Sequence, residues 1–372
     1  MGRRGPRDTH DSRQHGANVN GKQSTAKSGL WKQLAGIAAA ILLLWLAFRG
    51  MDMQQFMLQI KRIQPLLILP LFISALVSHF LRALRWVILL RPVSEKPVSL
   101  WNSFCAVMIG YAVNIAIPRG GEVARLVSIS RTENLPWAGV LPTMFIDRLI
   151  DIALLAILLG CTLIFFPTTA TSNLPWLVPG GVTLSISAVL GLFALPKMAD
   201  LITWLIERQW IKTHLPARIL QAISKLSEQF HTGTQSLSSP GAYPAITALS
   251  VAIWFFYWLN YYIMIWAFGL QHVVSPAQCL VVFTIGSVGV LVPTPGSIGS
   301  THFLVSQGLV MVSGVDRDLA LAFATVLHMF TFVVVNCLGA AVCVAIQSSR
   351  NKEQQLPPPE TDHTVPQPDE AG

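Results

Sequence analysis

The sequence LWNSFCAVMIGYAVNIAIPRGGE, residues 100–122, decides how this chain folds. It is an apolar run that ends abruptly in a proline, an arginine, two glycines and a glutamate, residues 118–122. A helix facing lipid cannot continue through such residues, because broken backbone leaves N–H and C=O groups unpaired in hydrocarbon. Broken backbone survives only inside protein or against a watery cavity. The run therefore predicts a helical hairpin sheltered within a bundle.

The composition of the whole chain agrees with a membrane protein. Of its 372 residues, 52% are hydrophobic and only 12% are charged, and the mean hydropathy is +0.54. Soluble domains contain about 25% charged residues. The pI near 9.5 is compatible with nucleic-acid binding. The basic residues, however, lie between apolar runs and in the N-terminal arm, which favours an anionic membrane surface as partner.

Six apolar stretches approach the roughly 20 residues that a spanning helix needs. They are residues 30–48, 65–81, 140–166, 176–195, 245–268 and 319–346. Two further stretches, 100–117 and 277–292, are interrupted by proline and glycine. Inverted repeats with broken helices at mid-membrane are a recurring design of transporters.

The distribution of basic residues decides between eight spans and six. Loop 197–243 carries five basic residues in its first 29 positions, and eight spans with a cytoplasmic N-terminus would place it outside. This conflicts with the excess of Lys and Arg in cytoplasmic loops. If the interrupted stretches are re-entrant hairpins, at about 100–135 and 277–313, the conflict disappears. The sequence thus predicts an all-α polytopic membrane protein with six spans, two oppositely oriented hairpins, an inverted repeat and both termini in the cytoplasm.

This prediction divides the chain into a membrane domain, residues 30–347, between two solvated ends. Residues 1–29 are expected to form a disordered basic arm, and residues 348–372 a disordered tail. Within the membrane domain, loop 197–243 is expected to form a cytoplasmic amphipathic helix on the inner leaflet. A soluble helix covering the inner mouth is the alternative.

The end of the first hairpin carries the residues best suited to bind an anion. Gly120 and Gly121 allow close approach of the backbone, and a helix restarting at Glu122 would point free N–H groups into the cavity. Arg119 and Arg125 lie beside it, so a phosphate-bearing head group is the expected ligand. The alternative is a cytoplasmic turn in which the arginines follow the positive-inside rule and Glu122 caps the helix.

A second polar group lies inside the following span. Asp147 and Asp151 share a helix face, and Arg148 is three residues from Asp151. Ionised groups facing lipid are costly, so these side chains must face the bundle. We expect them to pair with Arg119 or Arg125. A purely structural ion-pair cluster near the inner interface is the alternative.

Two more groups complete the candidate residues. Arg82, Arg85 and Trp86 close the second predicted span, and we expect them to be interfacial anchors. The second hairpin contributes Pro293, Pro295, Gly296, Gly299 and His302. His302 is expected to be a hydrogen-bonded packing residue, although an imidazole there could titrate near neutral pH.

These motifs resemble one family. Residues 114–125, residues 145–148, residues 293–299 and the helix end 81–86 are similar to the membrane domain of lysylphosphatidylglycerol synthases and their stand-alone, flippase-like relatives. The resemblance implies a module that translocates or handles lipids in the bacterial inner membrane. By position it also implies polar site residues: Arg119, Glu122, Arg125, Asp147 and Arg148. His302 stands where the family usually has an acid, and the chain has no room for the soluble aminoacyl-transferase domain.

Together these observations predict a lipid flippase or transporter. Its expected substrate is an anionic or phosphate-containing (glyco)phospholipid or a lipid-linked intermediate. Expected partners are membrane lipids with anionic head groups and lipid-synthesis enzymes, without nucleic acid, metal or cofactor. The sequence has no GxxxxGK[ST] loop, so an ion gradient or mass action would drive transport. The alternatives are a membrane-embedded enzyme on lipid-linked substrates and a non-catalytic scaffold for lipid or glycan synthesis.

Overall fold

The computed structural model describes residues 37–165, 179–183, 185–187, 190, 204, 221, 224, 228 and 241–355. In these parts of the chain every regular element is a helix. After a helix at Ile37–Phe48, the elements are α2 (Met53–Lys61), η1 (Pro65–Leu67), α3 (Ile68–Leu90), η2 (Arg91–Val93), α4 (Leu100–Ala116), α5 (Gly120–Thr132), α6 (Trp137–Phe165), α11 (Ala242–Ala267), α12 (Pro276–Gly289), η3 (Pro295–Ser297), α13 (Ser300–Ser313), α14 (Arg317–His328), η4 (Met329–Val334) and α15 (Val335–Gln355).

Four helical stretches in the described residues are long and apolar enough to cross a membrane, which confirms an all-α polytopic membrane protein. They are Pro65–Val93, Trp137–Phe165, Ala242–Ala267 and Arg317–Ser349. The pair Ile37–Phe48 and Met53–Lys61 counts as a fifth span only if taken together, because it bends by 87°. Gly50, with a φ of +75°, lies in this bend.

Four predicted features fall wholly or largely outside the described residues. They are the N-terminal arm, the span 176–195, loop 197–243 and the C-terminal tail 348–372. The second span was predicted to end at residue 81, but the helical stretch continues to Val93. The boundary was wrong because Arg82 and Arg85 are buried in the bundle and do not mark an interface.

The two interrupted stretches form helical hairpins. The arms of the first are α4 and α5, and those of the second are α12 and α13; at 13 to 17 residues each arm is short for a span. The arms approach closely at glycines. A Cβ on Gly121 would overlap the carbonyl oxygen of Gly110, and one on Gly289 would lie 3.1 Å from the Ser300 backbone.

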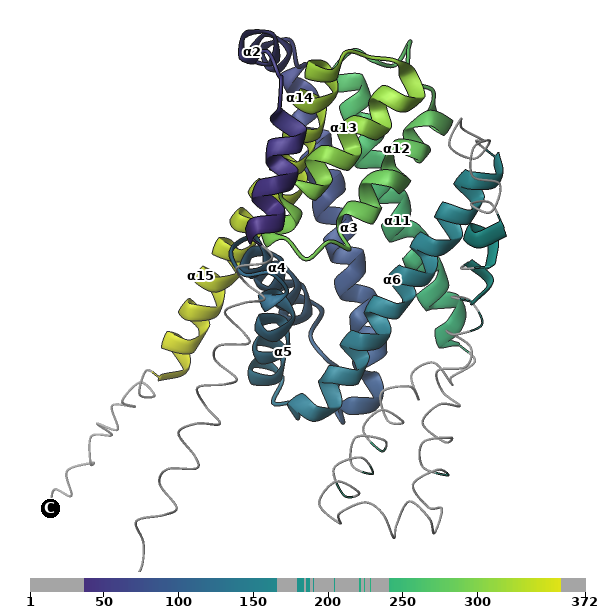
Figure 1. Ribbon diagram of the computed structural model, residues 1–372. Helices are drawn as coiled ribbons and strands as arrows, with labels where there is room; N and C mark the ends of the chain where they lie inside the picture. The colour runs from purple at the N-terminus through teal and green to yellow at the C-terminus, as the bar shows by residue number, and fades with distance from the viewer. Residues whose placement is uncertain are drawn as a thin grey trace, which may run out of the picture.

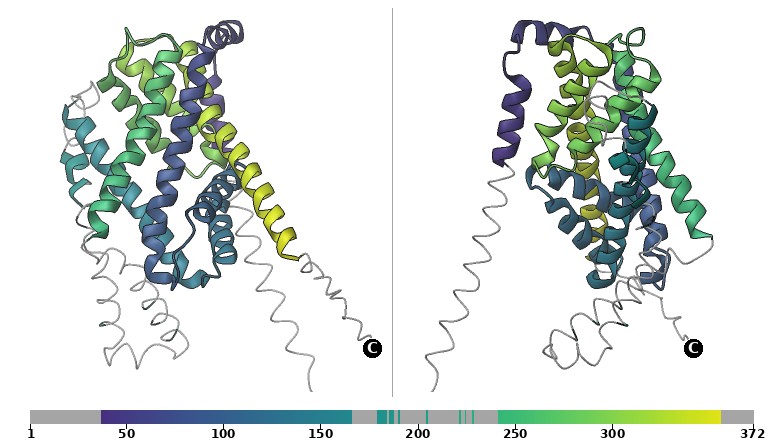
Figure 2. Two further views of the ribbon diagram at one scale, coloured as in Figure 1. Left: turned by 180° about the vertical axis from the view of Figure 1, so that it is seen from behind. Right: turned by 45° about the vertical axis from the view of Figure 1, so that its right-hand side comes forward.

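The two hairpins enter the bundle from opposite ends and meet near its middle (Figure 1). Each follows one long helix and precedes another: α3, hairpin, α6, and then α11, hairpin, α14–α15. The central helices α3 and α11 run side by side, as the left view of Figure 2 shows. At the meeting point, a Cβ on Gly296 would lie 3.4 Å from the Cα of Ile115. This order is the one expected of an inverted repeat, and re-entry of the hairpins in a bilayer stays a prediction.

Candidate functional site

Helix α3 carries a stripe of buried polar side chains. Ser78, His79, Arg82 and Arg85 follow one another at intervals of one, three and three residues, which keeps them on one side of the helix. The side chain of Arg82 is 3% exposed and that of Arg85 is fully buried. Two arginines inside an apolar bundle require counter-charges.

The counter-charges come from α6. The carboxylate of Asp147, which is also fully buried, accepts four hydrogen bonds from arginines. Its Oδ1 accepts from Nε and Nη2 of Arg85 at 3.0 and 2.7 Å, and its Oδ2 accepts from Nη1 of Arg82 and Nη1 of Arg125, both at 3.1 Å. One helical turn on, Asp151 accepts from Nη2 of Arg82 at 2.6 Å and from Nη2 of Arg85 at 2.8 Å. Asp147 is therefore the centre of the cluster.

Helix α11 completes the coordination of the two α3 arginines with neutral groups. Nε of Arg82 donates to the hydroxyl oxygen of Tyr257 at 3.1 Å, and Nη1 of Arg85 donates to Oγ of Ser250 at 2.9 Å. Three long helices, α3, α6 and α11, are thus joined by one hydrogen-bonded network. Satisfied networks of this kind rigidify a core.

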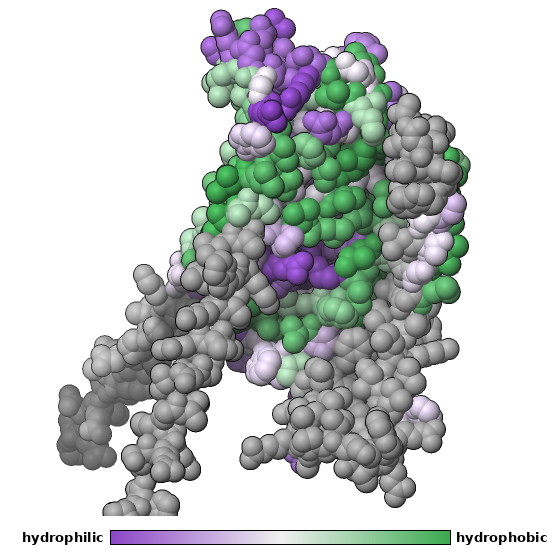
Figure 3. Space-filling model, in the orientation of Figure 1, coloured by the Kyte–Doolittle hydropathy of each residue, from purple (hydrophilic) through white to green (hydrophobic). Residues whose placement is uncertain are grey.

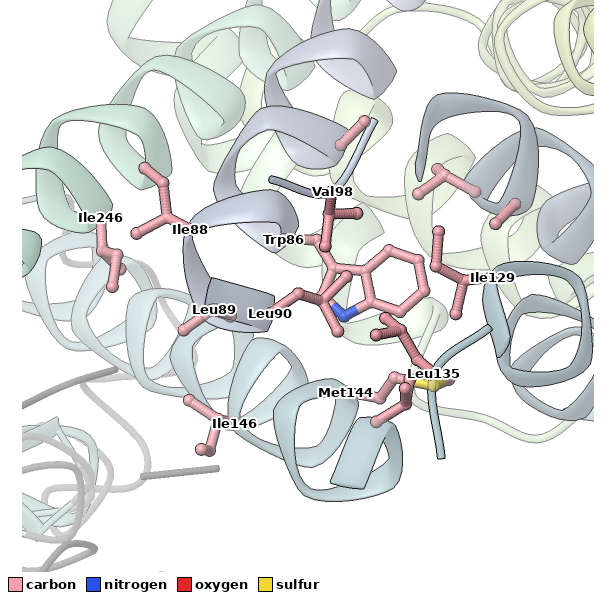
Figure 4. Close-up of a cluster of buried hydrophobic side chains, with 14 of the residues drawn as sticks. Trp86, Ile88, Leu89, Leu90, Val98, Ile129, Leu135, Met144, Ile146 and Ile246 are labelled. Atoms are coloured by element: carbon pink, nitrogen blue, oxygen red, sulfur yellow. The ribbon is translucent and has the colours of Figure 1, made fainter. Parts of the chain in front are cut away.

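The third buried arginine is held differently. Arg125 reaches the cluster from α5, with a single ionic contact to Asp147 and its guanidinium 3.7 Å from the ring centre of Trp86. Trp86 lies amid apolar side chains from α3, α5 and α6 (Figure 4), and its Nε1 donates to Oγ1 of Thr143 at 3.1 Å. Among the described residues, Nε and Nη2 of Arg125 have no hydrogen-bond partner although they are buried.

The outer edge of the cluster is accessible. Arg148 pairs with Glu122 at 2.7 Å, and both side chains are about one-third exposed. The cluster contains four arginines and three acids, and its net charge is therefore +1. The arginines are Arg82, Arg85, Arg125 and Arg148, and the acids are Glu122, Asp147 and Asp151. Figure 3 shows a hydrophilic patch at mid-height, between α4 and α6 and surrounded by hydrophobic surface. At the edge of the cluster, the side chain of Arg119 is exposed and those of Glu122 and Arg148 are half-buried.

A small pocket, of about 10 Å³, lies between the first hairpin and this edge. It is lined by Val107, Gly110, Tyr111, Asn114, Gly121, Glu122, Arg125 and Arg148. The room is that of about one water molecule. Two arginines and one glutamate contribute to its lining, and it is too small for a lipid head group in this conformation.

The start of α5 differs from the prediction. The helix begins at Gly120, so Glu122 lies in its first turn. The N–H of Gly120 donates to the carbonyl of Ile117 at 3.0 Å, and that of Gly121 to Oδ1 of Asn114 at 2.8 Å. These two amides are already bonded and are not available to an oxyanion. Arg119 precedes the helix with a φ of +60° and an exposed side chain.

The tip of the second hairpin forms a separate site. Gly296 and Gly299 both have positive φ, +56° and +85°, and the carbonyl of Gly296 is 2.8 Å from Nε2 of His328. His302 packs against His328, with ring centres 4.9 Å apart. The two hairpin tips touch, but no ion pair joins them in the described part of the chain.

Comparison with protein families agrees with this architecture. Residues 33–339 match the family model described as the lysylphosphatidylglycerol synthase TM region. The chain belongs to this family. No curated protein and no solved structure gives a significant match. Family membership indicates a lipid-related function for this multi-pass membrane protein.

In this family member, the structure places some of the predicted site residues in the ion cluster and others outside it. The structure has the expected pairing of Asp147 with Arg125, while no ion pair of Arg119 occurs among the described residues. The prediction that Arg82, Arg85 and Trp86 are interfacial anchors was wrong. All three are buried, because α3 does not end at residue 81 but continues to Leu90, and these side chains face the neighbouring helices. Pro293 and Pro295 lie in the tip of the second hairpin, and neither contributes to the ion cluster in the described structure.

Several partners in this family member's site escaped the sequence analysis. Tyr257 and Ser250 lie on α11, 175 and 165 positions from the arginines to which they are hydrogen-bonded. Tyr111 lies under Arg82, with its ring centre 5.9 Å from the guanidinium carbon. A hydroxyl in an apolar helix is a weak signal, because it can bond to its own backbone.

Proposed function

We propose that this protein binds lipids with an anionic or phosphate-containing head group and moves them across the membrane, with the pocket at the first hairpin as head-group site. The observation that carries the proposal is Arg125. Its guanidinium is buried beside the pocket, and two of its nitrogens have no partner in the described structure. An arginine offers a planar pair of donors that matches two oxygens of a phosphate or carboxylate.

The balance of charge supports an anion. The cluster carries a net charge of +1 while its members are mostly buried. Buried donors left unpaired cost about 1–3 kcal/mol each, more when charged. A singly charged phosphodiester would neutralise the cluster and satisfy those donors. A head group without an anionic phosphate or carboxylate would leave the positive charge of the cluster uncompensated.

Binding requires the pocket to open, because it now has room for about one water molecule. The contact best able to open is the Arg148–Glu122 pair, which joins α6 to α5 at the exposed edge. Exposed pairs of this kind contribute only about 0–1 kcal/mol. The Asp147 contacts are buried and would hold α3 and α6 together during the movement.

The proposed movement of the lipid follows from the two hairpins. In inverted-repeat transporters, the two halves exchange conformations and expose a central site to either side in turn. Here hairpins from opposite ends meet at mid-height, next to the polar patch. Within this proposal the protein resides in a bacterial inner membrane with both termini in the cytoplasm.

The test is a leaflet-resolved lipid assay in proteoliposomes. Transport of labelled phosphatidylglycerol is compared with that of an uncharged, phosphate-free glycolipid carrying the same acyl chains. We expect transport of the anionic lipid only, and a loss of about tenfold or more in Arg125→Gln, since charged hydrogen bonds contribute about 1.5–3 kcal/mol. The matched control is Arg131→Gln, an exposed arginine in the last turn of the same helix.

Two results would contradict the proposal. One is equal transport of both lipids by the unmodified protein. The other is an Arg125→Gln protein that elutes as a folded species and transports as fast as Arg131→Gln.

A further inference from the structure

The tip of the second hairpin contains two imidazoles that the head-group site does not use. His302 lies near the start of α13 and His328 at the end of α14, and their side chains are 7% and 6% exposed. Nε2 of His328 is 2.8 Å from the carbonyl oxygen of Gly296. Because a carbonyl only accepts, Nε2 carries a proton in this contact, and in the neutral imidazole Nδ1 of His328 then holds the lone pair.

Polar atoms around these rings lack partners. Nδ1 of His302 and Oγ1 of Thr301 are buried and have no hydrogen-bond partner within the described residues. Such atoms cost free energy in a core, and their presence in a native structure calls for an explanation. Directly after His328 the chain forms a π-helix, η4, a rare geometry that is frequent at functional sites.

The surroundings of the two rings are almost free of charge. Phe48 and Phe332 are the aromatic neighbours, with ring centres 6.3 Å from His302 and 5.3 Å from His328. Around them, the helix Ile37–Phe48, η3 and η4 contain no ionisable side chain, α12 contains only Cys279 and α4 only Cys105 and Tyr111.

The charged residues of α14 and α2 lie at helix ends that are distant in sequence from the two histidines. Arg317 and Asp318 begin α14, ten or more residues from His328, which is about 15 Å along a helix. Arg317 also donates to the carbonyls of Leu46 and Ala47. On α2 the only charged side chain is that of Lys61. In these elements of the described structure the only carboxylate is that of Asp318, so none lies beside the two rings to stabilise an imidazolium in this conformation.

We propose that His302 and His328 form a proton-binding site that takes up a proton only when the second hairpin tip leaves its present contacts. An unpaired buried cation is strongly unfavourable, so the conformation described here holds the pair neutral. Protonation stabilises a conformation in which the rings are hydrated and His328 has released Gly296. The tip that His328 holds is the one that touches the first hairpin at Ile115.

The proposal connects proton uptake with the tip contact between the two halves. It rests on the proposed function only for the role of that movement in lipid transport. The proton site itself is tested without lipid substrate.

The test measures the position of the tip as a function of pH. In a background with the five native cysteines replaced, spin labels are attached at Leu291 in the tip and at Ile73 on α3, both about half exposed. Distance distributions between the two labels are recorded at pH 8 and pH 5 by double electron–electron resonance spectroscopy in nanodiscs. We expect a second distance to grow toward pH 5, with the population ratio changing by up to about tenfold per pH unit for one proton.

Variants then assign the shift to the two imidazoles. His328→Gln keeps an amide that can donate to Gly296, and His302→Asn keeps a polar group of similar reach. The double variant is expected to retain its pH 8 distribution at pH 5. His272→Asn, which removes an exposed imidazole before α12, is expected to shift like the unmodified protein. If the double variant does not fold, each single variant should show a smaller shift than the His272→Asn control.

An unmodified protein with the same distribution at both pH values overturns the proposal, and so does a shift that persists undiminished without the two imidazoles. Absence of lipid transport together with an intact pH-dependent shift would reject the proposed function and leave the proton site standing. Transport of anionic lipid without any pH-dependent shift would reject the proton site and leave the proposed function standing.

Discussion

Replacement of Asp147 by asparagine removes the centre of the ion cluster while leaving its volume unchanged. The carboxylate accepts four hydrogen bonds from three arginines in a fully buried position. Without it, the net charge of the cluster rises from +1 to +2. An asparagine offers one acceptor oxygen and two donors, and the donors face guanidinium groups that cannot accept.

The expected cost is large for a single substitution. Removing one partner of a buried ion pair costs about 3–5 kcal/mol, because the remaining charge stays uncompensated. With a midpoint shift of about 2–4 °C per kcal/mol in larger domains, this lowers the unfolding midpoint by on the order of 10 °C. The assay is thermal unfolding of the purified protein in detergent, followed by tryptophan fluorescence.

The matched comparison is Glu122→Gln, which breaks an ion pair in the same cluster at its exposed edge. About one-third exposure of both side chains limits that cost to about 0–1 kcal/mol. A double-mutant cycle sharpens the test, since Arg125→Gln in the Asp147→Asn background returns the net charge to +1. We expect the double variant to be more stable than the sum of the two single effects predicts. An Asp147→Asn protein as stable as Glu122→Gln, or strictly additive effects in the cycle, would refute the reasoning.

Three further outcomes are expected. Gly121→Ala should destabilise the protein by about 1–3 kcal/mol or more, since its Cβ overlaps the Gly110 carbonyl, whereas Gly241→Ala, with no atom nearby, should change the unfolding midpoint little. Ser275→Ala, which removes the capping box of α12, should cost about 1 kcal/mol in the same assay, and an unchanged midpoint would contradict the role of the cap. Single cysteines at Lys96 and His272 should be labelled from opposite sides of sealed vesicles; labelling of both from one side would contradict the predicted sidedness.

The sequence predicted the hairpins because their signal is local. Proline and glycine end an apolar run at residues 118–121 and again at 293–299, and backbone cannot remain unpaired in lipid. The structure places α4–α5 and α12–α13 at these positions. The pairing of the polar groups, in contrast, has no local signal in the sequence. Arg85 and Asp147 are 62 positions apart, and nothing in either neighbourhood specifies the other.

The start of α5 shows a second limit. The sequence placed the first helical residue at Glu122, so that the glycine amides would be free for a ligand. In the structure, Asn114 from the preceding arm bonds the N–H of Gly121, and the helix starts two residues earlier. A side chain that competes with a ligand for a backbone amide becomes visible only when the two arms are packed.

The burial of Arg82 and Arg85 could have been predicted from helix periodicity. Anchoring arginines at an interface need only lie near the end of a span, and they can point in any direction. Here Ser78, His79, Arg82 and Arg85 instead share one side of α3, at the spacing that places them in line. A polar stripe of that length facing lipid would cost several kcal/mol, so it must face other helices. An arginine pair three residues apart that continues a line of smaller polar residues therefore predicts a buried ion cluster, and it also predicts that the acids lie on a different helix, because α3 contains none.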